Sequence, residues 1–297
     1  MIGKYRRIGG LTGRLPVLIV GAVMAGAFVF VASAPAQAVV TCDGLPATIV
    51  GTSGADTLTG TSGPDVIAGL GGNDTISGLA GDDRICGGDG ADTVYGESAT
   101  VGVGLLLGGA DRIFGEGGND YLVGDVASID SLVAAGVLAG GNFIEGGGGN
   151  DIIFGSCVDS TVTTAGAGLL SGSSTLAGGD STDTIYGQCQ TLTVTVAVAS
   201  VEGGNDTITA GDAADTIFGD WGSVTSVGTI AATGFRDDID AGAGADTIYG
   251  DAQSGNSSLT PVLTAFSDTI DGGVGSDGGD AGPGADTCTN TETVSNC

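Results

Sequence analysis

Aspartate residues recur every nine positions in part of this 297-residue chain, and they are its clearest candidates for chemistry. Five nonapeptides follow one another without a gap from Gly51 to Tyr95: GTSGADTLT, GTSGPDVIA, GLGGNDTIS, GLAGDDRIC and GGDGADTVY. Each has Gly first, Gly fourth, Asp sixth and an aliphatic residue eighth. Carboxylates and the exposed carbonyls of glycine-rich turns are hard oxygen ligands, which Ca²⁺ prefers. The pattern therefore predicts calcium binding at the sixth position.

The same register continues after Tyr95 as pairs of nonapeptides separated by longer segments. Eighth positions at 113, 144, 176, 208, 239 and 270 show a second period of 31 or 32 residues, made of two nonapeptides and about a dozen inserted residues. Two repeats carry Asn142 and Ser174 at the sixth position, and Asp277 precedes two glycines in place of an aliphatic residue, which predicts a weaker site. The predicted metal ligands are Asp56, Asp65, Asp74, Asp83, Asp92, Asp111, Asp120, Asp151, Asp183, Asp206, Asp215, Asp237, Asp246, Asp268 and Asp286.

The elements that position these residues follow from the nonapeptide itself. Residues seven to nine should form a short strand with the eighth side chain inward, and the six before it a turn in which glycine permits unusual backbone angles. Two nonapeptides then make a coil of 18 residues, and stacked coils lie about 4.8 Å apart. Asp56, Asp74 and Asp92 are expected on one edge of the stack, and Asp65 and Asp83 on the other. The predicted fold is an all-β parallel β-roll or β-solenoid, with the inserts as longer strands or hairpins on one side.

The interior of such a coil is too thin to hold the fold alone, because each repeat buries essentially one side chain worth roughly 1.5–3 kcal/mol. Carboxylates stacked at strand spacing repel one another unless a cation lies between them. Magnesium is less suited than calcium, since it demands a tighter octahedron and loses water reluctantly. Transition metals lack their preferred imidazole ligand, because the chain contains no histidine.

The charge balance excludes several classes of function. The chain has 35 acidic and seven basic residues, and only Arg84, Arg112 and Arg236 lie beyond residue 38, so residues 39–297 carry 3 − 35 = −32. Such a chain repels nucleic acid and anionic membranes. Without histidine no Ser-His or Cys-His pair and no HExxH motif can exist. We expect a protein that is not an enzyme, although paired carboxylates of the glycosidase kind are arithmetically possible.

The chain divides into five segments. Residues 1–38 are typical of an export signal, with a basic start, an apolar stretch from Leu15 to Ala32 and the cleavage site Ala36-Gln37-Ala38; the alternative is an uncleaved membrane anchor. Residues 39–50 are an N-terminal cap that keeps only Ile49 of the repeat, 51–98 the tandem β-roll, 99–289 the roll with inserts, and 290–297 a C-terminal cap. The predicted location is extracellular, with no membrane contact after cleavage.

Six cysteines, all after residue 38, fit an oxidising compartment and disulfides. Cys157 and Cys189 both follow Gly-x at the start of an insert and lie one long period apart, which favours a bond between stacked neighbours. Cys288 with Cys297 could hold the C-terminal tail over the last coil. Cys42 with Cys86 is then left by elimination, and it requires the N-terminal segment to fold back over about two coils. The alternative is free, buried cysteines.

These repeats resemble the RTX family of bacterial calcium-binding proteins, whose consensus is GGxGxDxUx, and the stretch from Cys42 to Tyr95 is similar to secreted actinobacterial members. The resemblance covers most of the chain from Gly51 to Thr289. It implies a parallel β-roll that folds when calcium binds between successive turns, through the sixth-position Asp and main-chain carbonyls. Many RTX proteins append such repeats to a toxin or enzyme, whereas this chain has an N-terminal signal and almost nothing but repeats.

Three functions stay open at this point. The first is a secreted, calcium-stabilised protein with a structural or surface-interaction role and an unknown extracellular ligand. The second is a recognition face on the inserts that binds ice or carbohydrate, because Thr191, Thr193 and Thr195 share one face of an alternating strand. The third is a non-catalytic remnant or accessory of a secreted RTX hydrolase. Trp221 and Tyr249 are expected to pack within the fold rather than to bind sugar.

Overall fold

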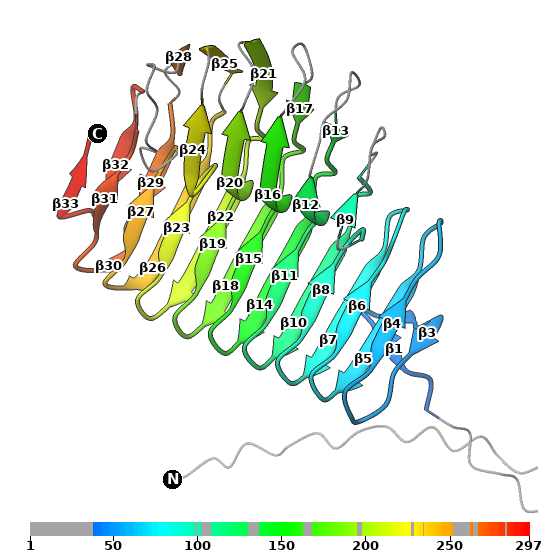
Figure 1. Ribbon diagram of the computed structural model, residues 1–297. Helices are drawn as coiled ribbons and strands as arrows, with labels where there is room; N and C mark the ends of the chain where they lie inside the picture. Colours follow the sequence, from blue (N-terminus) through cyan, green and yellow to red (C-terminus); the bar gives the residue numbers. More distant parts are fainter. Residues whose placement is uncertain are drawn as a thin grey trace, which may run out of the picture. The chain divides into compact units, whose positions relative to one another are not determined.

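The computed structural model is entirely β-structure (Figure 1). It describes residues 38–98, 100–101, 108–129, 137–162, 168–194, 198–226, 229–233, 235–251, 262–263, 267–282 and 284–297. Over these residues no helix is long and apolar enough to cross a membrane. The chain separates into two units, Met1–Ala38 and Val39–Cys297, and the description below concerns the second. The predicted export signal lies outside the described residues, except for Ala38.

Two long parallel sheets are built from the nonapeptides, one strand of each per coil. The first sheet contains, in order, β3 (Ile49–Val50), β5 (Val66–Gly71), β7 (Arg84–Asp89), β10 (Arg112–Gly117), β14 (Phe143–Gly148), β18 (Thr175–Asp180), β22 (Thr207–Asp212), β26 (Asp238–Gly244), β29 (Thr269–Asp271) and β32 (Thr287–Thr289), with β30 (Val274–Gly275) also paired to β26. The second sheet contains β4 (Thr57–Thr59), β6 (Thr75–Ser77), β8 (Thr93–Tyr95), β11 (Tyr121–Val123), β15 (Ile152–Phe154), β19 (Thr184–Tyr186), β23 (Thr216–Phe218), β27 (Thr247–Tyr249), β31 (Gly278–Asp280) and β33 (Thr293–Ser295).

The inserts form two further parallel sheets of five strands each. The third sheet contains β9 (Thr100–Val101), β12 (Val126–Ile129), β16 (Cys157–Val162), β20 (Cys189–Val194) and β24 (Ser223–Ser226). The fourth contains β13 (Val137–Leu138), β17 (Gly168–Leu170), β21 (Val198–Glu202), β25 (Thr229–Thr233) and β28 (Val262–Leu263). Over the described residues, the two strands of an insert pair with neighbouring coils and not with each other. Of the two predicted forms, longer strands or hairpins, the structure shows longer strands, which continue the solenoid stacking.

Strand register confirms both periods of the sequence. Ile67 pairs with Ile85 eighteen residues later, and Ile113 pairs with Ile144 thirty-one residues later. The strands of the second sheet are three residues long, as predicted for positions seven to nine. Strands of the first sheet such as β5 have six residues, because pairing continues into positions one to three of the next nonapeptide.

The core consists of the eighth-position side chains, which stand in two facing columns between the first and second sheets. Each is essentially inaccessible to solvent, and the columns are Ile67, Ile85, Ile113, Ile144, Leu176, Ile208, Ile239 and Ile270 on the first sheet and Ile76, Val94, Leu122, Ile153, Ile185, Ile217 and Ile248 on the second. A repeat thus contributes one aliphatic side chain, and the interior is as thin as the sequence predicts.

A second apolar cluster lies at the ninth position of the second sheet, where Phe154, Tyr186 and Phe218 are buried. Their rings stack with Tyr249 at centroid distances of 5.0, 4.7 and 4.9 Å. Trp221 is also buried, at 4% exposure. The expectation that Trp221 and Tyr249 pack within the fold is therefore confirmed.

All three predicted disulfides are present: Cys42–Cys86, Cys157–Cys189 and Cys288–Cys297. The first holds the hairpin of β1 (Thr41–Cys42) and β2 (Leu45–Pro46) against β7, two strands beyond β3. In that hairpin Asp43 forms ion pairs with Arg84 at 3.4 Å and with Arg112 at 2.8 Å. The N-terminal segment thus folds back over about two coils, as the pairing by elimination requires.

Candidate metal centre

The turns that lead into the second sheet place their sixth residues in one column, called here the uninterrupted ladder because no insert enters these turns. The backbone N–H of each Asp donates a hydrogen bond of 2.7–3.0 Å to Oδ1 of the Asp one coil further on. The ladder consists of Asp56, Asp74, Asp92, Asp120, Asp151, Asp183, Asp215, Asp246 and Asp277.

The turns that lead into the first sheet form a second column, called here the interrupted ladder because most of its turns are split by an insert. The same backbone-to-side-chain hydrogen bond links its members, at 2.6–3.2 Å. The ladder consists of Asp65, Asp83, Asp111, Asn142, Ser174, Asp206, Asp237, Asp268 and Asp286. The structure thus places every predicted ligand in one of two columns, on the edges that the register predicts.

The second carboxylate oxygen of these residues, Oδ2, distinguishes three Asp from all the others. Thr52 N–H and Thr61 N–H donate to Oδ2 of Asp56 and Asp65 at 2.5 and 2.6 Å, so the first rung of each ladder is closed by its own turn. Gln188 Nε2 donates a hydrogen bond of 2.6 Å to Oδ2 of Asp206, the third of these Asp. The remaining Oδ2 atoms are buried without any hydrogen-bond donor, in Asp74, Asp83, Asp92, Asp111, Asp120, Asp151, Asp183, Asp215, Asp237, Asp246, Asp268, Asp277 and Asp286.

First-position glycines lie against these oxygens. A Cβ on Gly69 would stand 2.4 Å from Oδ2 of Asp74 and 2.3 Å from the carbonyl oxygen of Gly87 in the next coil. Real Cβ atoms do not approach other atoms so closely, so only glycine fits here. The constant spacing of first-position glycine and sixth-position Asp therefore brings a carboxylate oxygen close to a main-chain carbonyl oxygen of the adjacent coil.

The electrostatics of the ladders are unfavourable for bare carboxylates. Burial is the main cause that raises the pKa of Asp120 to about 7, against an opposing hydrogen bond from the Asp92 N–H and with added repulsion from Asp151 and Asp92. Burial likewise raises the pKa of Asp183 to about 7 and that of Asp111 to about 9. A buried, unpaired carboxylate is costly unless a proton or a cation compensates it.

The donor set fits Ca²⁺. Most rungs offer a buried carboxylate oxygen without a donor, beside main-chain carbonyls, and these are the hard ligands that calcium takes. Among the described residues no three acidic or cysteine side chains gather as a set of metal ligands. An ion in a ladder would thus be held by the carboxylates of successive rungs, with carbonyl oxygens completing the set, and its charge would offset the repulsion between rungs.

The predicted ligands omit two acids at the end of the uninterrupted ladder: Asp277, whose site the sequence predicts to be weaker, and Glu292. Asp277 lies in the uninterrupted ladder like its neighbours, with 0% exposure and a free Oδ2. Glu292 ends that ladder, since its Oε2 accepts a hydrogen bond of 2.8 Å from the N–H of Asp277. The predicted C-terminal cap thus contains one more worn repeat, which could be found from Val294, two residues after the acid and aligned with Gly279.

A further column occupies the second position of the split turns, directly after the first-position glycine. Its members are all buried, and from Asp125 onward they recur with the long period of 31 or 32 residues: Glu97, Asp125, Ser156, Gln188, Asp220 and Asp251. The recurrence is visible in the sequence, but their burial depends on the direction in which the insert leaves the turn.

No curated protein and no solved structure matches this chain. The RTX calcium-binding nonapeptide repeat matches in eight segments, at residues 50–85, 69–98, 107–126, 138–156, 170–188, 199–225, 228–255 and 264–288, which together cover more than half of the chain. The matched segments contain both ladders and most of the core columns. This chain therefore belongs to the family of RTX calcium-binding repeat proteins.

Proposed function

We propose that this protein is secreted, binds several Ca²⁺ ions along its two ladders, folds when it binds them outside the cell, and serves there as a structural or surface-interaction protein. We propose no catalytic role. The ladders and the second-position column account for most of the buried acids, and the chain has no histidine to act as a general base. Three disulfides support an oxidising, extracellular location.

The observation that carries this proposal is the set of buried Oδ2 atoms without a donor. A native protein satisfies nearly all of its buried polar groups, and exceptions call for an explanation such as a bound ion. Here the exceptions recur at the sixth position of most coils, on both edges. An isolated unsatisfied group would not have this periodicity, whereas a column of cations would require it.

Calcium would supply the free energy that the thin core lacks. A site that binds only the folded chain stabilises it by RT ln(1 + [L]/Kd), which is about 1.4 kcal/mol at ten times Kd. Extracellular calcium modules have a Kd on the order of 10⁻⁴–10⁻³ M. Stacked coils contact only their neighbours, so folding of one coil favours binding at the next. The chain would then stay unwound where calcium is scarce and wind up outside the cell.

Far-UV circular dichroism of the mature protein tests this directly. We expect a disordered spectrum in chelator, β-structure in millimolar Ca²⁺, and little response to the same concentration of Mg²⁺. Chelated protein with the full β-spectrum, or an equal response to Mg²⁺, would contradict the proposal.

Two alanine variants separate the ladders from ordinary surface acids. Asp74→Ala removes a carboxylate that is 1% exposed and has a free Oδ2, and it should shift the calcium midpoint of folding to higher concentration. Asp159→Ala removes an exposed acid of the third sheet that accepts a hydrogen bond from Thr191 Oγ1, and it should leave the midpoint nearly unchanged. Equal shifts would show that the ladder has no special role.

A second candidate function is supported by the third sheet. Thr161, Thr193 and Thr225 lie in register on β16, β20 and β24. Thr193 is partly exposed beside the buried Leu192, so this row faces outward. Ranked threonines at strand spacing could bind ice or carbohydrate. Thr195, which was predicted to share one strand face with Thr191 and Thr193, lies outside the described residues. Thermal hysteresis and a glycan array test this candidate, and Thr193→Val should abolish any such activity without unfolding the coil.

A further inference from the structure

The second-position column behaves differently from the second position of an uninterrupted turn. Leu70 and Glu116 in uninterrupted turns are exposed and have a positive φ of 82° and 72°. In a split turn the chain leaves for the third sheet at this point, and the second residue turns inward. Asp125 and Asp220 are 0% and 1% exposed. The inserts therefore add a buried side chain beside each rung of the interrupted ladder that follows a split turn.

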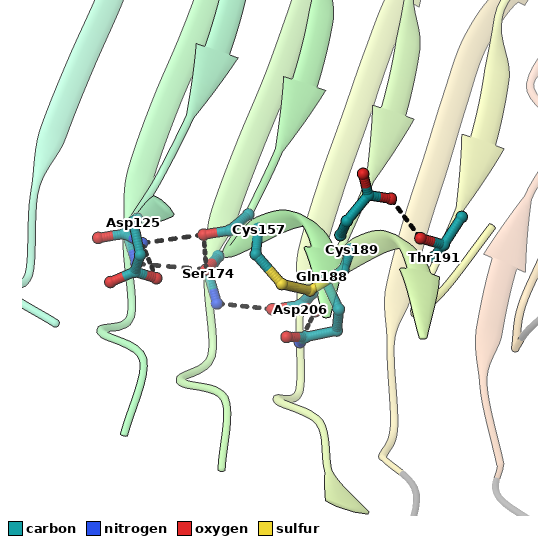
Figure 2. Close-up of a disulfide and its surroundings, with 10 residues drawn as sticks. Asp125, Cys157, Ser174, Gln188, Cys189, Thr191 and Asp206 are labelled. Carbon is teal, nitrogen blue, oxygen red and sulfur yellow. Dashed lines mark hydrogen bonds between the residues drawn. A yellow bond between two sulfur atoms is a disulfide. The ribbon is translucent and has the colours of Figure 1, made fainter. Parts of the chain in front are cut away.

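In two coils this added side chain and the ladder residue form a pair of one acid and one amide. Gln188 Nε2 donates a hydrogen bond of 2.6 Å to Oδ2 of Asp206 (Figure 2). Asn142 Nδ2 donates to Oδ2 of Asp125 at 3.1 Å and to the carbonyl oxygen of Gly155 at 2.9 Å. One partner is an acid and the other an amide, and the amide N–H group satisfies the carboxylate.

In the next two coils the same pair of positions holds two acids: Asp220 with Asp237, and Asp251 with Asp268. The ladder residue has not moved. A Cβ on the first-position glycine would lie 2.7 Å from Oδ2 of the ladder Asp in the Gln188 coil, and 2.5 and 2.7 Å in the two following coils. Where Gln188 supplies a donor, these coils supply a second carboxylate.

Four carboxylate oxygens of these two pairs have no donor. Oδ1 of Asp220 and Oδ2 of Asp237, Asp251 and Asp268 are all buried without a hydrogen bond. Burial raises the pKa of Asp251 to about 8, with added repulsion from Asp268. The described residues form direct ion pairs only between Asp43 and the arginines Arg84 and Arg112. Arg236 opposes the burial-induced rise in the pKa of Asp268 by charge attraction, but it forms no direct ion pair with these acids.

We propose that Asp220 with Asp237, and Asp251 with Asp268, each hold one Ca²⁺ in a second kind of site, in which a second-position acid joins the ladder residue. In the coils that pair an acid with an amide, the N–H group of Gln188 or Asn142 takes the place of the cation. Two carboxylates and nearby main-chain carbonyls, such as that of Gly250 beside Oδ2 of Asp237, are a hard donor set. This inference rests on the proposed calcium binding of the ladders.

The number of Ca²⁺ ions bound per chain, measured by native mass spectrometry of the mature protein at saturating calcium, tests the inference. Asp220→Asn should bind one ion fewer than the wild type and still fold, because the new amide can donate to Asp237. Gln188→Glu should bind one ion more, because it creates an acidic pair with Asp206. The control Asp240→Asn removes an exposed acid of β26 and should leave the number unchanged.

The outcomes separate the two levels of the proposal. A wild type that binds no calcium overturns the function proposed for the ladders. A wild type that binds calcium, together with unchanged numbers in Asp220→Asn and Gln188→Glu, overturns only the second kind of site. If Asp220→Asn fails to fold, the number bound by Gln188→Glu decides alone, since one additional ion supports the site and an unchanged number contradicts it.

Discussion

The two ladders share one hydrogen-bond geometry but differ in what satisfies their carboxylates. The uninterrupted ladder has an acid on every rung, and from Asp74 to Asp277 every Oδ2 is buried without a donor. The interrupted ladder replaces two rungs with Asn142 and Ser174 and satisfies a third through Gln188. At these three rungs an uncharged side chain, Asn142, Ser174 or Gln188, thus removes the need for a cation. Dependence on calcium should therefore be uneven along the molecule, and weakest at residues 137–194.

The largest expected effect comes from removing one carboxylate of the uninterrupted ladder, in the region where the other ladder has the uncharged rungs Asn142 and Ser174. Asp151→Ala removes the acceptor of the Asp120 N–H and one ligand of the proposed ion. Removal of one partner from a buried charged set costs about 3–5 kcal/mol. Urea unfolding at fixed millimolar calcium measures the loss.

The matched variant on the other ladder is Ser174→Ala in the same region. Ser174 Oγ accepts a hydrogen bond of 3.2 Å from Asn142 N–H and has no charge to compensate. Its loss should cost about 1 kcal/mol, with no change in the calcium midpoint. Comparable losses for Asp151→Ala and Ser174→Ala would remove the distinction between the ladders.

The Cys157–Cys189 disulfide should matter next. It joins β16 to β20 (Figure 2). These strands belong to the coils in which the interrupted ladder has the uncharged rungs Asn142 and Ser174. Closure of a loop of this length stabilises a fold by about 3–4 kcal/mol in the chain-entropy account. Replacement of both cysteines by serine should lower the free energy of unfolding by about that amount in calcium.

Hydrogen exchange in chelator shows whether this segment is also the least dependent on metal. We expect residual protection at residues 137–194 in the wild type, and its loss in the variant without the disulfide. Uniform exchange along the wild-type chain in chelator would contradict an uneven dependence on calcium.

A pH titration of the metal-free protein should have a smaller effect, and its sign follows from the raised pKa values. Asp120 and Asp183 have pKa values of about 7 in the wound form, against an ordinary value near 3.8. Between these values the wound form binds more protons than the unwound chain, so its stability falls as pH rises through about 7. Metal-free protein should show more β-structure at pH 5 than at pH 8, by circular dichroism.

Calcium should reverse this dependence, because protons then compete with the ion for the same oxygens. The calcium midpoint of folding should rise as the pH falls from 8 to 5. A metal-free spectrum that does not change with pH would show that the ladder carboxylates are not what keeps the apo chain unwound.

The smallest expected effect concerns the first rungs, which are closed without an ion. Thr61 donates to Asp65 Oδ2 through its N–H and through Oγ1 at 2.9 Å. Thr61→Ala removes only the second bond and should cost about 1 kcal/mol or less, by thermal unfolding in calcium. A loss as large as that of Asp151→Ala would place a cation at the first rung too.

Much of this architecture follows from spacing alone. The nine-residue period places Asp and the aliphatic residues, and the 31–32-residue period places Cys157 beside Cys189. In the sequence, however, the sixth-position Asp look equivalent, whereas in the structure some of their Oδ2 atoms have a hydrogen-bond donor and others have none. Oδ2 of Asp65 meets the N–H of the exposed Thr61 in its own turn, whereas Oδ2 of Asp206 meets the buried side chain of Gln188. The second case depends on where an insert leaves the turn, which is a property of the assembled coil and not of the nonapeptide.

The most direct test of calcium in the ladders is a crystal structure of the calcium-loaded protein, with anomalous scattering to identify the ions. The account predicts ions beside the Oδ2 atoms of the uninterrupted ladder from Asp74 to Asp277, and none beside Ser174. Ladder oxygens that bind only water, with calcium confined to exposed acids such as Asp159, would contradict it.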